Sequence, residues 1–119
     1  MSDLVVYVRT NHMEVVNVKN GNVAQGTGAF TTTRLLVGRF QVAEELLTKL
    51  VGEVKSKGFF SARPRLLIQP LEMIEGGLCE VEERVFLELG ASAGARHVKV
   101  HAGQRLSPQA ALDVLNAGA

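Results

Sequence analysis

Tryptophan is absent from this sequence, aromatic residues are few, and the charges of the two signs nearly cancel. Aromatic residues make up 5% of the 119 residues, and 13 Lys and Arg stand against 12 Asp and Glu, for a net charge of +1. A nearly neutral chain has no general electrostatic attraction to nucleic acid. Too few aromatic side chains are present to build a base-stacking platform. We therefore expect no nucleic-acid partner.

Disulfides and long apolar runs are also missing. Cys79 is the single cysteine, which excludes an internal disulfide and fits a reducing cytoplasm. No apolar run approaches the roughly 18 residues of a membrane helix, and the first residues lack the basic-then-apolar pattern of a secretion signal. We expect a cytoplasmic protein with no integral membrane segment. The composition, 46% hydrophobic and 21% charged, suits one globular domain over residues 1–119.

The first third of the chain has the pattern of β-strands. Residues 4–8 and 13–18 are dense in β-branched side chains. Asn20-Gly21 predicts a tight turn, because both residue types tolerate positive φ, and a third strand should start at Val23. The β character continues through residues 31–37. We predict an antiparallel meander that reaches this last segment, with the bounds of the third strand left open.

From residue 41 onward the pattern changes to helices that alternate with strands. Apolar residues recur every four residues from Val42 to Val54, which predicts a helix over residues 41–57. The later elements are a strand over 65–69, a loop over 71–78, a helix over 79–93 with Val81 and Val85 on its apolar face, a strand over 97–101, and a helix that begins at Ser107-Pro108. The order β-β-β-α-β-α-β-α predicts an α/β domain whose mixed sheet is covered by helices, as in a ribonuclease H-like fold.

Four blocks of the sequence resemble the MreB family of bacterial actin-like, rod-shape-determining proteins. They are residues 4–11, 36–47, 59–68 and 80–98. The resemblance implies an actin-like ATPase core reduced to its first core subdomain, with the family's small insertion shortened to residues 26–34. It also implies work in the cytoskeleton, cell shape or envelope assembly of a bacterium, which is analogy alone, because a fold does not fix a function.

The residues that carry nucleotide chemistry in that family differ in this chain. Tyr7 and Arg9 stand where the family's first phosphate loop has an Asp for Mg²⁺ and a Gly beside the phosphate. Residues 100–108 contain no acid where the family positions its hydrolytic water. A nuclease of this fold would need clustered carboxylates for two metals, yet the strands carry Tyr7, Gln69 and His101. We predict that the protein is not an enzyme, needs no cofactor and does not bind a nucleotide.

The preferred hypothesis is a non-catalytic protein-interaction module that binds a protein partner or forms a homodimer. Four apolar residues follow the strand over 65–69, at the end where open α/β sheets place their ligand crevices: Leu71, Met73, Ile74 and Leu78. Apolar loop residues often mark a surface for a partner. They can equally fold back over the core as a local lid.

The alternative hypothesis is a domain that binds a nucleotide or another small anion without hydrolysing it. Arg9 would supply a positive charge, and the turn at Thr10 and Asn11 would contact phosphate. These are the degenerate phosphate-loop positions of the resemblance.

Other candidate sites have simpler interpretations. His97 and His101 would share one face of a strand about 13 Å apart, and His12 and Cys79 come from remote segments, so we expect no metal site. Carboxylates crowd the first turn of the helix over 79–93, where they either favour the helix dipole or form a patch for a basic partner: Glu80, Glu82 and Glu83.

Overall fold

The structure is a computed structural model that describes residues 2–55 and 63–117. Over these residues it has five strands and three helices, in the order that the sequence predicts. They are β1 (Asp3–Arg9), β2 (His12–Asn17), β3 (Val23–Thr27), α1 (Phe40–Val54), β4 (Arg65–Pro70), α2 (Glu80–Ser92), β5 (His97–Val100) and α3 (Pro108–Asn116). No helix within the described ranges has the length and apolar character needed to cross a membrane.

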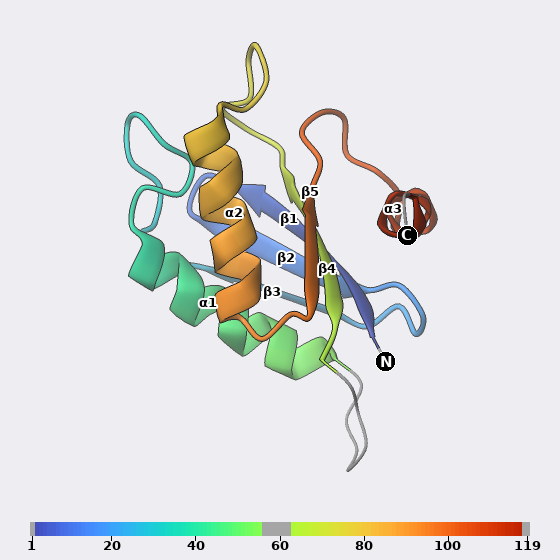
Figure 1. Cartoon of the computed structure of the whole chain (residues 1–119). Coiled ribbons are helices and arrows are strands. Elements are labelled where there is room, and N and C mark those ends of the chain that lie inside the picture. The colour runs from blue at the N-terminus through green and yellow to red at the C-terminus, as the bar shows by residue number, and fades with distance from the viewer. Residues whose placement is uncertain (1, 56–62, 118–119) are drawn as a thin grey trace.

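The strands form one mixed sheet in the order β3-β2-β1-β4-β5. β2 pairs antiparallel with both β1 and β3, whereas β4 pairs parallel with both β1 and β5. Figure 1 shows α1 and α2 on one face of this sheet and α3 on the other. The predicted α/β class, with a mixed sheet between helices, is therefore confirmed.

Side chains of the central strand β1 alternate between two hydrophobic cores. Val6 and Val8 belong to the larger core under α1 and α2, and Val5 and Tyr7 belong to the smaller core under α3, where Leu115 joins them. This alternation follows from the pleat of a strand, in which successive side chains point to opposite faces. β1 and β4 are nearly continuous apolar runs because helices cover both of their faces.

The segment that follows β3 is a folded loop and not a strand. The predicted β character over residues 31–37 is wrong, because Thr31 and Thr32 form hydrogen bonds within the loop and Thr31 also bonds to the turn between β1 and β2. The Thr31 hydroxyl accepts from the Asn11 amide at 3.0 Å and donates to the Leu36 carbonyl at 2.7 Å. The Thr32 amide donates to the Leu35 carbonyl at 2.9 Å. Such local bonds compete with a strand ladder and fold the chain into turns.

The first helix ends earlier than its apolar period predicts. α1 spans Phe40–Val54, and Lys55 is extended, whereas the predicted helix ran to residue 57. The Nδ2 of the buried Asn17 donates to the Val54 carbonyl at 2.8 Å, which satisfies a free carbonyl in the last turn of the helix. Residues 56–57 of that prediction, and residues 59–62 of the MreB-like block, lie outside the described residues.

Candidate functional site

The ends of the two central parallel strands form the place where a sheet of this kind holds ligands. Tyr7 of β1 and Gln69 of β4 are register partners at this end, and both side chains are buried. His101 follows β5 directly, and its amide donates to the Ile68 carbonyl at 3.0 Å. The three side chains that the sequence placed here therefore lie at the ends of neighbouring strands, with His101 just past the end of β5, and none of them is a carboxylate.

A segment between β5 and α3, residues 101–107, lies over these strand ends, and we call it the closing loop. The Tyr7 hydroxyl donates to the Leu106 carbonyl at 2.6 Å, and the Leu106 amide donates to Oε1 of Gln69 at 2.9 Å. Nε2 of Gln69 donates to the Gln104 carbonyl. Because these bonds pair buried polar groups with the backbone of the loop, the polar side chains at the strand ends are used to hold the chain itself.

Arg105 of the closing loop adds a charged contact above Tyr7. Its guanidinium carbon lies 3.8 Å from the centroid of the Tyr7 ring, and its Nη2 lies 2.9 Å from Oε1 of Glu14 on β2. Burial raises the pKa of the Tyr7 phenol, Arg105 lowers it, and Glu14 raises it further; burial is the largest of these effects. The phenol is therefore neutral and able to donate at physiological pH.

Metal ligands do not gather at this site. The part of the chain that the structure describes contains no group of three His, Cys, Asp or Glu side chains that could hold a metal ion. Glu14 is the acid nearest to the strand ends in the contacts described above, and it is paired with Arg105. The carboxylate of Glu14 is thus already engaged by a cation of the chain itself.

The candidate anion turn forms the tight connection between β1 and β2. Asn11 adopts a positive φ of 53°, as turns of this kind require. The Thr10 amide donates to Oε1 of Glu72 at 2.6 Å, and the Asn11 carboxamide oxygen accepts from the Thr31 amide at 2.9 Å. Arg9 is exposed at the end of β1. The Thr10 amide, which would face a phosphate, thus already faces a carboxylate.

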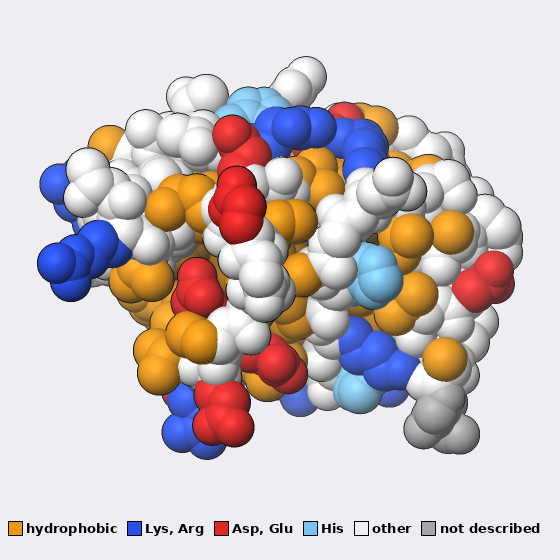
Figure 2. All heavy atoms as spheres, turned by 90° about the horizontal axis from the view of Figure 1, so that it is seen from above, with side chains coloured by type: hydrophobic (Ala, Val, Ile, Leu, Met, Phe, Trp, Pro, Cys, Tyr) orange, Lys and Arg blue, Asp and Glu red, His pale blue; other side chains and the backbone are white. Residues whose placement is uncertain are grey.

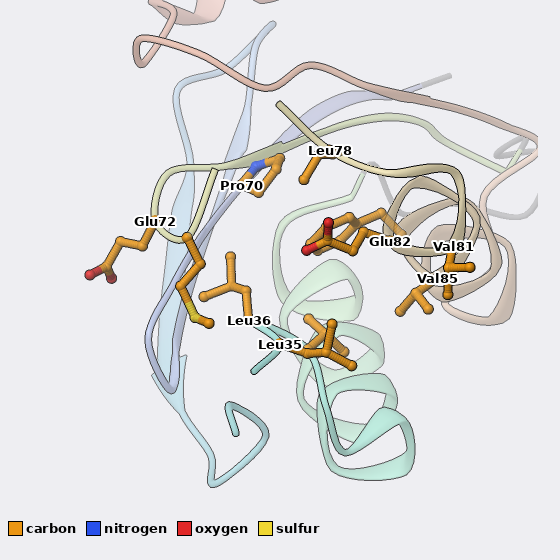
Figure 3. Close-up of a pocket in the computed structure, with 11 residues that line it drawn as sticks. Leu35, Leu36, Pro70, Glu72, Leu78, Val81, Glu82 and Val85 are labelled. Atoms are coloured by element: carbon orange, nitrogen blue, oxygen red, sulfur yellow. The ribbon is translucent and has the colours of Figure 1, made fainter. Parts of the chain in front are cut away.

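A shallow depression with apolar walls opens between α2 and two loops, and we call it the apolar groove. Its lining includes apolar residues from the loop before α1, from the loop after β4 and from α2: Leu35, Leu36, Met73, Leu78, Val81 and Val85. Figure 3 shows these segments converging, with the carboxyl group of Glu72 turned away from the centre. The enclosed volume is about 20 Å³, which is room for roughly one water molecule and too little for a metabolite.

The structure divides the four predicted interaction residues between different surroundings. Met73 and Leu78 line the apolar groove and pack on the larger core, but Leu71 packs against the smaller core on the other side of the sheet. Ile74 is half-buried in the same loop and does not line the groove. The four residues are thus not one continuous surface, and the groove takes its other members from segments that the sequence did not single out.

One of those members, Val81, belongs to the apolar face that the sequence predicts for its helix, but the core does not cover it. Its side chain is 69% exposed. The helix α2 meets the sheet most closely in its second half, where Gly90 packs against Val98 of β5. The first turn of α2 instead borders the groove, so the apolar residues of the helix continue past the part that packs on the sheet. Leu35 was not predicted as a candidate site residue, because the sequence analysis assigned its segment to a strand.

The remaining candidates have local roles. Cys79 is exposed and caps the start of α2, where its amide donates to Oε1 of Glu82 at 3.2 Å. Glu80 and Glu83 stand exposed in the same turn. His97 is exposed on β5, and the alternation of that strand puts it on the same face as His101.

A solved structure and a known sequence resemble this chain to different degrees. No model of a protein family matches the chain. The solved structure titled as a study of the Aquifex aeolicus PPX-GPPA enzyme aligns with 86% of this chain and 36% of the enzyme chain, at 16% identity and a TM-score of 0.40. This chain thus spans about a third of that enzyme, and a likeness this weak assigns no fold.

The second similarity is in sequence and covers most of both proteins. The Escherichia coli K12 protein named "Uncharacterized protein YjaA" is 35% identical over 98 residues, which are 78% of this chain and 77% of that protein. Identity at this level over that length reflects common descent, and so the chain belongs to the YjaA family.

Proposed function

We propose that this chain is a non-catalytic protein-interaction module with an actin-like, ribonuclease H-like fold. The strand order β3-β2-β1-β4-β5, with a meander at one side and parallel strands at the other, supports this assignment. In this proposal residues 1–119 are a single domain that corresponds to a reduced first core subdomain of MreB. Work in bacterial cell shape or envelope assembly, in the cytoplasm, is the biological setting that the resemblance suggests.

The observation that carries the proposal is the closing loop. An actin-like ATPase needs carboxylates and open backbone amides at the strand ends to hold Mg²⁺ and phosphates. Here Tyr7 and Gln69 are bonded to the backbone at Leu106 and Gln104, so these strand ends are filled by the chain itself. A domain whose ligand crevice is filled retains its outer surfaces for function, and the apolar groove is such a surface.

Calorimetric titration with ATP and ADP, with and without Mg²⁺, tests the loss of nucleotide chemistry. We expect no heat of binding at millimolar nucleotide. Saturable binding would overturn the proposal and favour the anion-binding alternative. Arg9→Ala then locates the site, because binding that disappears in this variant depends on the candidate anion turn.

Partner capture tests the interaction function itself. Val81→Asp places a charge in the groove at an exposed position, so the fold should tolerate it. Leu87→Asp is the matched control, because Leu87 is 38% exposed on the same helix and does not line the groove. We expect the first variant, and not the second, to lose bound protein or to shift the oligomeric state seen by light scattering. Equal behaviour of both variants would exclude the groove as the interaction site.

A further inference from the structure

The apolar groove has one wall that suits a helix. Val81 and Val85 lie four residues apart on α2, so they form a row along one side of that helix. Leu35 and Met73 stand on the other walls and are only half-buried. Rows of this kind accept the ridges of a second helix, and the small enclosed volume leaves contact along the surface as the way to bind.

The loop that carries Met73 is held in an uncommon conformation. Met73 has a φ of 57°, a left-handed value that residues with a side chain seldom adopt, and Gly76 and Gly77 also have positive φ values of 79° and 87°. The Gly77 amide donates to the Ile74 carbonyl at 2.9 Å and closes the turn. Glycine adopts such values freely, so the backbone strain of this loop lies at Met73. Strained residues of this kind cluster at binding sites, and Met73 is one of the residues that line the groove.

Carboxylates stand at the edge of the apolar centre. Glu72 and Glu82 line the groove, and Glu75 is exposed in the loop between them. Glu80 and Glu83 belong to the side of α2 that carries Leu87 and Arg84. Hydrogen bonds from the Thr10 and Cys79 amides hold the carboxylates of Glu72 and Glu82 in place. Figure 2, which looks down on this end of the molecule, shows acidic side chains set among hydrophobic ones.

This negative charge is local, because the whole chain has a net charge of +1. We infer that the apolar groove binds an amphipathic helix of a partner protein that carries lysine or arginine beside its apolar stripe. The apolar stripe packs on Val81, Val85 and Met73, and the basic side chains meet the carboxylates at the edge of the groove. The inference rests on the proposed interaction function and names the chemistry of the partner.

The binding of a basic amphipathic helix can be tested with two synthetic peptides of about 16 residues, which is long enough for several helical turns. Both share one leucine stripe; one has lysines on its polar face and the other has glutamates. The full chain is titrated with each peptide while NMR follows the methyl signals of Met73, Leu78 and Val81. We expect the lysine peptide to shift these signals, with an affinity that falls as salt is added. The glutamate peptide should leave them in place.

Changing the charges at the edge of the groove tests the role of the carboxylates. Glu72→Gln, which keeps the oxygen that accepts from the Thr10 amide, combined with Glu75→Lys should weaken binding of the lysine peptide by about three- to tenfold at low salt, since exposed charge pairs contribute little each. Glu53→Lys is the control, because Glu53 is exposed on α1 and does not line the groove. Val81→Asp should abolish binding, whereas Leu87→Asp should not.

Three results would overturn the inference. Equal binding of the glutamate peptide would show that the groove does not select charge, although an interaction surface would remain. Equal loss in Glu53→Lys would show a general charge effect. If neither peptide moves the groove signals, the groove does not take an amphipathic helix. The nucleotide titration decides the proposed function separately, so the two failures are distinguishable.

Discussion

Gly90 lies where α2 comes closest to the sheet. A Cβ on this residue would lie 2.7 Å from Cγ2 of Val98 and 3.3 Å from Cδ1 of Ile68. Alanine is normally the better helix former by about 1 kcal/mol. At this position the clash should outweigh that preference, so we predict that Gly90→Ala lowers the free energy of unfolding by about 1–3 kcal/mol, measured by urea unfolding.

Gly52 supplies the control for the same substitution. It also lies inside a helix, α1, but apart from its chain neighbours and the nearby backbone of that helix, no atom lies within 4 Å of the Cβ position. Gly52→Ala should therefore raise the free energy of unfolding by up to about 1 kcal/mol. Two changes of the same sign would mean that close packing of α2 on β5 does not decide the effect.

Tyr7 gives a prediction about pH that can be followed directly, since it is the single tyrosine of the chain. Burial raises the pKa of its phenol in the folded protein. The neutral phenol therefore contributes stability that is fully present below the unfolded pKa of about 10 and is lost as pH rises through the folded pKa. Tyrosinate absorbance should appear at higher pH in the folded protein than in urea.

The variant Tyr7→Phe isolates the same group. It removes the hydrogen bond to Leu106 and should lower the free energy of unfolding by about 1 kcal/mol near neutral pH. The stability gap between wild type and variant should narrow above pH 10 or so, because only the wild type loses the phenol contribution there. A gap that stays constant, with tyrosinate appearing at one pH in both states, would show that the phenol is not buried against the closing loop.

At the scale of elements, α3 is held at its last turn by side chains from the sheet. The Lys99 ammonium donates to the Val114 carbonyl at 2.9 Å and also to the Ala117 carbonyl. A cation at this position satisfies free carbonyls and favours the helix dipole. We predict that Lys99→Met, which keeps the apolar part of the side chain, lowers the free energy of unfolding by about 1 kcal/mol. Amide hydrogen exchange should become faster in α3 while exchange in the sheet stays unchanged. The control is Lys49→Met on the exposed side of α1, which should change neither the free energy of unfolding nor hydrogen exchange in α3. Faster exchange throughout the sheet in Lys99→Met would contradict a role of Lys99 that is limited to holding α3.

The sequence was informative where one period extended over a whole element. The four-residue repeat of α1 and the apolar run of β4 depend on burial along their full length, so local patterns found them. The loop around Thr31 was missed because its fold depends on a contact with Asn11, twenty positions earlier in the chain. A local pattern carries no information on such a bond.

The candidate site was predictable to the same degree. The position of Met73 and Leu78 after β4 follows from the strand end, and both residues line the apolar groove, while their role in binding stays a prediction. The exposure of Val81 could not be predicted, because it depends on how far α2 extends past the sheet, which close packing at Gly90 helps to fix. The closing loop was also missed. The absence of acids in residues 100–108 was visible, but the bonds that Gln69 makes to the loop were not.

At the scale of the whole molecule, the two faces of the sheet are covered unequally. Two helices cover the larger core, and α3 alone supplies helical cover for the smaller one, through Ala111 and Leu115. Val5 and Leu67 in that core are fully buried and belong to the same central strands that support the other face. Because one pair of strands is shared by both cores, we expect loss of α3 to unfold the entire domain cooperatively.

Leu115→Asp tests this cooperativity. It places a carboxylate in the smaller core at a position that is 1% exposed, at a cost of several kcal/mol, which is comparable with the whole stability of a domain this size. We predict dye binding to exposed apolar surface and loss of amide protection in β1 and β4 as well as in α3. Gln109→Asp is the matched control, because Gln109 is exposed in the first turn of α3, where a carboxylate favours the helix dipole. Leu115→Ala gives a milder change of about 2–5 kcal/mol in a chain that still folds. Loss of protection confined to α3 in both Leu115 variants would mean that the larger core is stable by itself and that α3 is a separable cover.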